Sequence, residues 1–162
     1  MKNKNIKICF TASSGGHLEE ISNLRMIQKK YDNFLITEKI KDIDEIKFAK
    51  RKYFVTQINR KEILFLFKFV CLFFKSFKIL RKEKPDYVIT TGALCTYPVC
   101  IIAKVLGAKI VYIESFARCD SISLTGKLMR KKADMFIVQW EEMINIIPEA
   151  IYVGGIFWFL YQ

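Results

Sequence analysis

The chain has 162 residues, of which 52% are hydrophobic and 14% aromatic, a composition that excludes general disorder and predicts one domain over residues 1–162. Lysine and arginine number 27 against 16 acidic residues, so the net charge is +11 and a negatively charged partner is expected. The five cysteines form no CxxC pair and there is one histidine, so no structural zinc site is predicted.

No targeting or membrane-spanning segment is expected. Residues 1–5 are polar, and the apolar run over residues 6–11 is only strand-length, which is too short for a secretory signal. No run of about 18 apolar residues occurs, so a simple transmembrane helix is not predicted. The protein is therefore expected in the cytosol or on the cytosolic face of a membrane.

Candidate strands and helices alternate along the chain. Apolar runs predict strands over residues 6–11, 33–37, 53–55, 86–91, 109–114, 135–139 and 152–153. Helical spacing predicts helices over residues 18–30, 60–84, 98–106 and 124–132, with the charged segment 38–52 partly helical or mobile. Continuous apolar strands that alternate with helices are typical of a Rossmann-like α/β fold, a parallel sheet with helices on both faces.

A glycine turn joins the first predicted strand to the first predicted helix. Gly15 and Gly16 allow the backbone to approach a ligand, so Ser14, Gly15 and Gly16 are expected to contact a phosphate of the substrate. Ligands of open parallel sheets bind beyond the carboxyl ends of strands, which makes His17 a candidate general base for a hydroxyl. The turn is neither a GxGxxG motif nor a P-loop, and a structural turn with His17 as helix cap is the alternative.

The predicted helix over residues 60–84 is both basic and rich in phenylalanine. Lysines recur every seven residues and form one stripe, with Lys78 beside it: Lys61, Lys68, Lys75 and Lys82. Most of the remaining circumference is apolar, including Phe69 and Phe73, which predicts a helix lying in the plane of an anionic membrane surface. A core helix and a helix covered by a protein partner are the alternatives. Nucleic acid is not an expected partner, because the basic residues alternate with bulky aliphatic ones.

The second half of the chain carries a more specific series of motifs. The series comprises Thr90-Thr91-Gly92, Pro98, Lys104, Gly107, Ile113-Glu114-Ser115-Phe116-Ala117-Arg118, Ser123-Leu124-Thr125-Gly126-Lys127, Ala133-Asp134 and Val138-Gln139-Trp140-Glu141. With the turn over residues 14–17, it resembles the accessory-subunit family of two-subunit GT-B glycosyltransferases over essentially the whole chain. That family includes bacterial capsule and exopolysaccharide subunits, and is similar to the eukaryotic subunit that recruits its partner to make dolichol-linked chitobiose.

The resemblance implies the N-terminal, acceptor-side half of a GT-B enzyme, which is inactive alone. A catalytic partner would supply the C-terminal half and most of the UDP-sugar site, giving a heterodimer. The acceptor would be a sugar on a polyprenyl diphosphate at the cytoplasmic face of the membrane, with no metal or cofactor, in capsule or exopolysaccharide biosynthesis. A self-sufficient small glycosyltransferase or nucleotide-binding enzyme is the alternative.

Several residues of these motifs are expected to line the acceptor cleft. Gly92, Glu114 and Arg118 follow predicted strand ends, and Arg118 could donate two hydrogen bonds to a diphosphate or else pair with Glu114. Ser123 and Thr125 would contact sugar or phosphate, with a helix cap as the alternative.

Two further features concern the shape of the cleft and the partner. The bulky residues 94–97, which follow Gly92 and Ala93, are expected to narrow the cleft or to reflect a substrate preference. Trp140 is expected to stack on a sugar, to anchor an interface or to lie in the core. The apolar tail, with Ile156, Phe157 and Trp158, is expected to dock on the partner.

Overall fold

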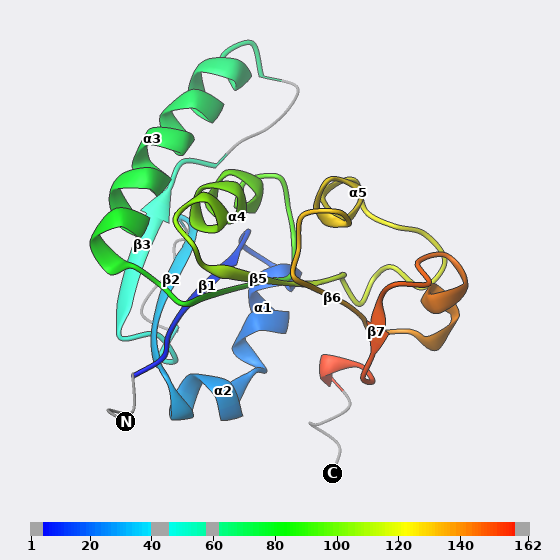
Figure 1. The fold of residues 1–162 in the computed structure, drawn as a ribbon. Coiled ribbons are helices and arrows are strands. Elements are labelled where there is room, and N and C mark those ends of the chain that lie inside the picture. The colour runs from blue at the N-terminus through cyan, green and yellow to red at the C-terminus, as the bar shows by residue number, and fades with distance from the viewer. Residues whose placement is uncertain (1–4, 40–45, 58–61, 158–162) are drawn as a thin grey trace.

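A computed structural model describes residues 5–39, 46–57 and 62–157, and a single seven-stranded sheet runs through them (Figure 1). The strand order is β3-β2-β1-β4-β5-β6-β7, and every neighbouring pair is parallel. The strands are β1 (Lys7–Ala12), β2 (Asp32–Glu38), β3 (Arg51–Val55), β4 (Tyr87–Thr90), β5 (Lys109–Ile113), β6 (Met135–Val138) and β7 (Ile151–Tyr152). The predicted parallel sheet is confirmed.

Helices cover both faces of this sheet, as predicted. On one face lie α1 (Gly16–Ser22) and α2 (Arg25–Lys30); on the other lie α3 (Phe65–Glu83), α4 (Thr96–Val105) and α5 (Leu124–Met129) (Figure 1). A 3₁₀ helix, η2 (Glu141–Asn145), follows β6 and has no counterpart in the sequence prediction.

Two apolar clusters, one on each face, form the core. Cys9 and Phe34 point to the face covered by α3 and α4, whereas the next residues, Phe10 and Leu35, point to the face covered by α1 and α2. All four side chains are fully buried. Successive residues of a strand point to opposite faces, so burial of both faces explains why these strands are apolar throughout.

The segment 18–30, predicted as one helix, forms two. The chain leaves the helix at Asn23 and Leu24, where Leu24 N donates to Ile21 O over only three residues. The side chain of Gln28 then donates to the same Ile21 oxygen at 2.6 Å. This side-chain bond satisfies a carbonyl that a continuous helix would have paired within its backbone, which offsets the cost of the break.

Two other predicted helices have different bounds. The helix expected over 60–84 begins at Phe65 and ends at Glu83, where Lys84 adopts a left-handed conformation (φ 50°) before Pro85. Residues 60 and 61 lie outside the described residues. The helix expected over 124–132 ends at Met129, and residues 130–132 form a turn.

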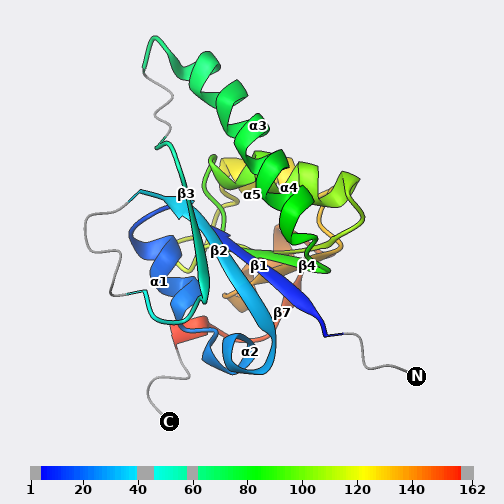
Figure 2. The ribbon, with the colours of Figure 1, turned by 90° about the vertical axis from the view of Figure 1, so that its left-hand side faces the viewer.

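The buried carboxylate of Glu83 holds the carboxyl end of α3 against strands β1 and β3. It accepts hydrogen bonds from Tyr53 Oη at 2.6 Å, Arg51 Nε at 3.0 Å and Lys7 Nζ at 3.3 Å. The amino-terminal turns of α3 project away from the sheet (Figure 2). Since α3 runs back from β3 to β4, these free turns lie at the carboxyl edge of the sheet.

Candidate functional site

The strand order reverses between β1 and β4, and the loops that follow these two strands meet at His17. Thr91 Oγ1 donates a hydrogen bond of 2.8 Å to the carbonyl oxygen of His17. Gly92 lies beside the imidazole with a positive φ of 105°, and an added Cβ there would sit 2.8 Å from Tyr112 Oη and 3.7 Å from His17 Cε1. Only glycine fits this position without strain, and ligands of open parallel sheets bind at such reversals.

The imidazole of His17 is half-buried. Its Nδ1 atom is buried and has no hydrogen-bond partner within the described ranges. Burial lowers the pKa of His17, so the ring is neutral at pH 7 and can accept a proton. The first turn of α1 shows no side-chain cap, so the alternative of His17 as a helix cap is not observed.

The glycine turn leaves backbone open beside His17. Gly15 (φ 83°) and Gly16 are exposed, and nothing lies within 4 Å of a Cβ added at either position. Ser14 Oγ instead faces the protein and donates to Glu38, a buried carboxylate at the end of β2, at 3.3 Å. Because α1 has only seven residues, its dipole is small, and phosphate binding by residues 14–16 remains a prediction.

Glu114, expected in the cleft, is buried and bonded to its own loop. Its Oε2 accepts from Ser123 N and Ser123 Oγ, each at 3.1 Å, and its Oε1 accepts from Ser115 N at 3.0 Å. A Cβ added at Gly126 would overlap Glu114 Oε2, so α5 approaches the carboxylate as closely as glycine permits. In this geometry Glu114 holds the start of α5 in place.

The polar residues at the start of α5, Ser123 and Thr125, have structural roles in this chain. Ser123 Oγ accepts from Gly126 N at 2.9 Å and caps α5, which confirms the helix-cap alternative. Thr125, in the first turn of α5, is buried. A direct contact of either residue with sugar or phosphate is an untested prediction.

Arg118 lies in the exposed loop that follows β5. Its Nη1 donates to Ser121 Oγ at 3.3 Å, and no ion pair with Glu114 is present in the described part of the chain. The guanidinium is therefore accessible, and its role as a diphosphate ligand remains a prediction.

A further carboxylate at this edge, Glu20, was not expected from the sequence. Its side chain is 3% exposed and reaches from α1 to the next two loops. Oε1 accepts from Ser115 Oγ at 3.0 Å and from Phe116 N at 3.2 Å, and Oε2 accepts from Gln139 Nε2 at 3.1 Å. Burial raises the pKa of Glu20 to about 7. The available sequence signal was its position between the apolar Leu18 and Ile21 on a short helix.

The residues expected at the partner interface pack against one another within this chain. Trp140 Nε1 donates to Phe116 O at 2.7 Å, and the Phe116 ring contacts those of Trp140 and Phe157 at centroid distances of 4.8 and 5.2 Å. Ile156 is buried and Trp158 lies outside the described residues. The exposed apolar side chains nearby are Ile151, Tyr152 and Val153.

An apolar groove of about 200 Å³ lies beside this cluster, on the sheet face that α1 and α2 cover only in part. Its lining includes Leu24, Ile27, Ile89, Val111, Ile137 and Ile156. The effect of the bulky residues 94–97 on the acceptor cleft stays a prediction. Cys95 is buried, and burial raises the pKa of its thiol, while Tyr97 packs against the core.

The amino-terminal half of α3 exposes a large apolar surface. Leu66, Phe67 and Phe74 are each about two-thirds exposed or more, whereas Phe69 and Phe73, which the sequence favoured, are half-buried and contact each other edge to face. Among the lysines, Lys75, Lys78 and Lys82 are exposed, Lys68 is paired with Glu62, and Lys61 lies outside the described residues. No helix among the described residues is long and apolar enough to span a bilayer.

Solved structures of similar fold agree with this architecture. UDP-N-acetylglucosamine 2-epimerase from Rickettsia bellii matches with a TM-score of 0.74 at 17% identity, covering 94% of this chain and 46% of that one. Acinetobacter baumannii MurG matches with a TM-score of 0.73 at 15% identity, covering 93% of this chain and 45% of that one. At these identities the likeness establishes the fold, a GT-B-like Rossmann half, and this chain spans just under half of each solved chain.

Relatives of known identity are more similar in sequence. The UDP-N-acetylglucosamine transferase subunit ALG14 of Mus musculus is 30% identical over 182 residues, covering 94% of this chain and 84% of the mouse protein. The human protein of the same name is 27% identical with the same coverage. A family model described as "Oligosaccharide biosynthesis protein Alg14 like" matches residues 8–156. The chain therefore belongs to the Alg14 family.

Proposed function

We propose that this chain is the acceptor-side accessory subunit of a two-subunit, UDP-sugar-dependent glycosyltransferase. The observation that carries the proposal is the open glycine turn and neutral His17 at the reversal point of a GT-B-like half, in a chain that covers 84% of a named transferase subunit. The transferred sugar is N-acetylglucosamine, because the relatives are named for its transfer. The capsule or exopolysaccharide setting expected from the sequence is not supported by these names and stays a prediction.

His17 is the proposed base of the transfer step. Its neutral imidazole takes the proton of the acceptor hydroxyl as that oxygen bonds to the anomeric carbon of the UDP-sugar, and UDP leaves with the electron pair of the broken bond. The partner subunit holds most of the UDP-sugar. The open backbone of Gly15 and Gly16 and the accessible Arg118 would face the sugar and the diphosphate of a polyprenyl-linked acceptor.

Helix α3 is the proposed attachment to the cytoplasmic face of an anionic membrane. Its exposed Leu66, Phe67 and Phe74 would enter the acyl boundary, while exposed lysines of its carboxyl half would meet the headgroups. The free turns of α3 and the His17 turn lie at the same edge of the sheet (Figure 2). A lipid-linked acceptor would thus be presented on the side where His17 lies.

Reconstitution with the catalytic subunit tests this function. The chain alone is expected to give no transfer from UDP-N-acetylglucosamine to a polyprenyl-diphosphate sugar, and co-expression with a GT-B C-terminal-half subunit is expected to give a stable complex that transfers. Robust transfer by the purified chain alone would overturn the proposal in favour of a self-sufficient enzyme.

A further inference from the structure

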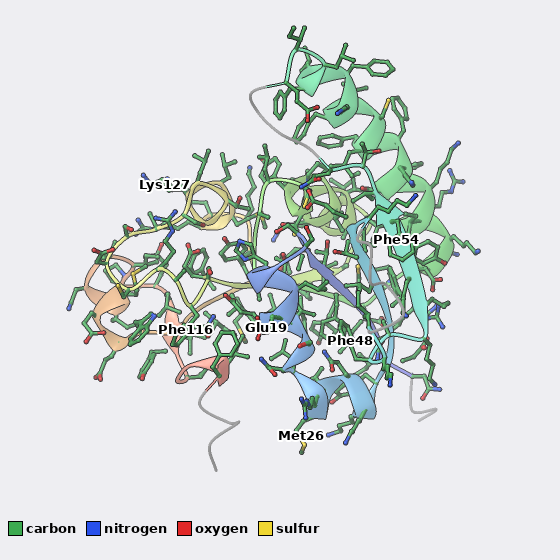
Figure 3. The ribbon with its side chains drawn as sticks, turned by 180° about the vertical axis from the view of Figure 1, so that it is seen from behind. Glu19, Met26, Phe48, Phe54, Phe116 and Lys127 are labelled. Carbon is green, nitrogen blue, oxygen red and sulfur yellow. The ribbon has the colours of Figure 1, made fainter. Side chains whose placement is uncertain are left out.

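Three segments that are distant in the chain meet at the side chain of Glu20. They are α1, the loop after β5 and the end of β6, and their hydrogen bonds to the carboxylate come from Ser115, Phe116 and Gln139. Figure 3 shows α1 and this loop side by side, with Glu19 and Phe116 labelled. No cation is paired with Glu20 among the described residues, so these neutral donors hold it alone.

Glu20 lies on the NH₂ side of the Gln139 amide. Because the carboxylate accepts, Gln139 must turn its NH₂ group toward Glu20, where it also donates to the carbonyl oxygen of Glu114 at 3.0 Å. The Gln139 oxygen then faces the opposite way and accepts from Ile156 N at 2.9 Å. Glu114 O can only accept and Ile156 N can only donate, so the amide has one satisfied orientation, in which its NH₂ faces Glu20.

The far ends of this network form the surface around Trp140. Phe116, whose amide is bonded to Glu20, receives the indole N–H of Trp140 on its carbonyl oxygen. Ile156, held through Gln139, precedes Phe157, whose ring contacts that of Phe116. His17 lies one helical turn before Glu20 on α1.

We propose that Glu20 is a positioning residue that couples the helix carrying His17 to the surface beside Trp140, where exposed Ile151, Tyr152 and Val153 would meet the second subunit. The coupling rests on the proposed function, since both the docking and the transfer step belong to it. Its physical basis is intramolecular. Glu20 on α1 accepts directly from Phe116 and Gln139, and Gln139 in turn accepts from Ile156 N, so displacement of α1 strains the bonds that hold residues 116 and 156. Binding of the second subunit near Trp140 would thereby orient His17.

The variant Glu20→Gln breaks the network without changing its size. Its amide oxygen can still accept from Ser115 and Phe116, but its NH₂ then faces the NH₂ of Gln139. Turning Gln139 over would place its NH₂ against Ile156 N–H, so a clash of two donors remains in either orientation. Glu19→Gln is the matched control, because Glu19 is exposed on the same helix and the change removes the same charge.

Amide exchange of the chain alone tests the coupling independently of any partner. In Glu20→Gln, protection at residues 153–157 and at the Trp140 indole N–H is expected to fall at least tenfold, with β1 and β2 unchanged. Protection equal to that of wild type and Glu19→Gln overturns the proposal even if the chain is a transferase subunit. With the catalytic subunit, the variant should bind several-fold more weakly and turn over more slowly at saturating partner; unchanged binding and turnover also overturn it.

A second variant decides the matter if Glu20→Gln does not fold. Of the three hydrogen-bond partners of Glu20, only the Ser115 hydroxyl can accept a hydrogen bond from the protonated carboxyl. The charged group that faces Glu20 is Glu114, whereas Ser115, Phe116 and Gln139 are neutral. In Ser115→Ala, the carboxyl proton either stays unpaired in a buried site or displaces the bond from Phe116 or Gln139, so protonation weakens the network. Protection of the Ile156 amide is therefore expected to be several-fold lower at pH 6 than at pH 8 in the variant, beyond any change in wild type. An identical pH response in both proteins overturns the proposal.

Discussion

The Thr91 hydroxyl donates to the carbonyl oxygen of His17 and so joins the loops on either side of the point where the strand order reverses. Gly92, the next residue, lies between the imidazole and Tyr112, and any side chain there would clash with the Tyr112 hydroxyl. The position of His17 is thus set by β4 and β5 as well as by its own turn, which explains how a single histidine on a seven-residue helix can be held for chemistry.

His17 is expected to control the acid limb of the pH profile of the assembled enzyme. Burial lowers its pKa, so the neutral base form persists below the ordinary value of about 6.5, and kcat/KM should fall only at lower pH. His17→Ala should reduce kcat about 100-fold. Both are measured with the purified complex, after confirming that the complex still forms. Undiminished turnover would leave His17 without a catalytic role.

Gly92→Ala is expected to lower both activity and stability. The new Cβ would meet Tyr112 Oη at 2.8 Å, and the φ of 105° is one that alanine adopts only under strain. The expected loss of unfolding free energy is about 2 kcal/mol, measured by chemical denaturation. Gly107→Ala is the control, because Gly107 has a similar φ of 94° with nothing within 4 Å. Equal losses in the two variants would mean that backbone strain, and not the approach to Tyr112, is what matters.

Membrane binding by α3 is expected to depend on both its apolar and its basic side chains. Leu66→Ser with Phe67→Ser and Phe74→Ser should weaken binding to anionic vesicles at least tenfold, because each removes apolar surface from the acyl boundary. Met26→Ser is the control, since Met26 is 84% exposed on the opposite face of the sheet (Figure 3).

The charge contribution is tested separately with Lys75→Glu, Lys78→Glu and Lys82→Glu. Each basic residue near an anionic surface contributes about 1 kcal/mol, so binding should be lost at low salt. Lys68 is omitted because it is already paired with Glu62. Lys127→Glu serves as the control, because it reverses the charge of an exposed lysine on a different helix, α5. Sedimentation that does not differ between the triple variant and wild type would contradict an electrostatic attachment.

Glu20 should make stability fall as pH rises. Burial raises its pKa from 4.5 to about 7, so the folded state keeps a proton that the unfolded chain releases between those values. The free energy of unfolding therefore gains this contribution fully below about pH 4.5 and loses it as pH approaches 7, by on the order of 3 kcal/mol. Relative to Glu20→Gln, wild type should lose this advantage between pH 4.5 and 7.5 in denaturation experiments. Parallel stability curves for the two proteins would show that Glu20 titrates normally.

The strands and helices could be predicted from the sequence because each is encoded in a short local pattern of residues. Apolar runs such as residues 109–114 and the break at Pro85 need no distant partner to be interpreted. The split of the 18–30 helix was missed because it depends on Gln28 reaching back to Ile21 in the folded chain. The 3₁₀ helix η2 was not predicted, because its five residues lack the apolar spacing of a longer helix.

The sequence by itself determined the fold class and the motifs that place this chain in its family, because hydrophobic period and residue type are local properties. Only the tertiary structure decided which polar residues are open and which are used internally. Ser123 donates to Glu114 at the start of α5, while Arg118, from the same motif as Glu114, reaches solvent. The tertiary structure also brings Glu20 into contact with Gln139, and the sequence does not indicate this contact because the two residues are far apart along the chain. Burial and hydrogen bonding depend on which segments the sheet order makes neighbours, and that order is a property of the whole fold.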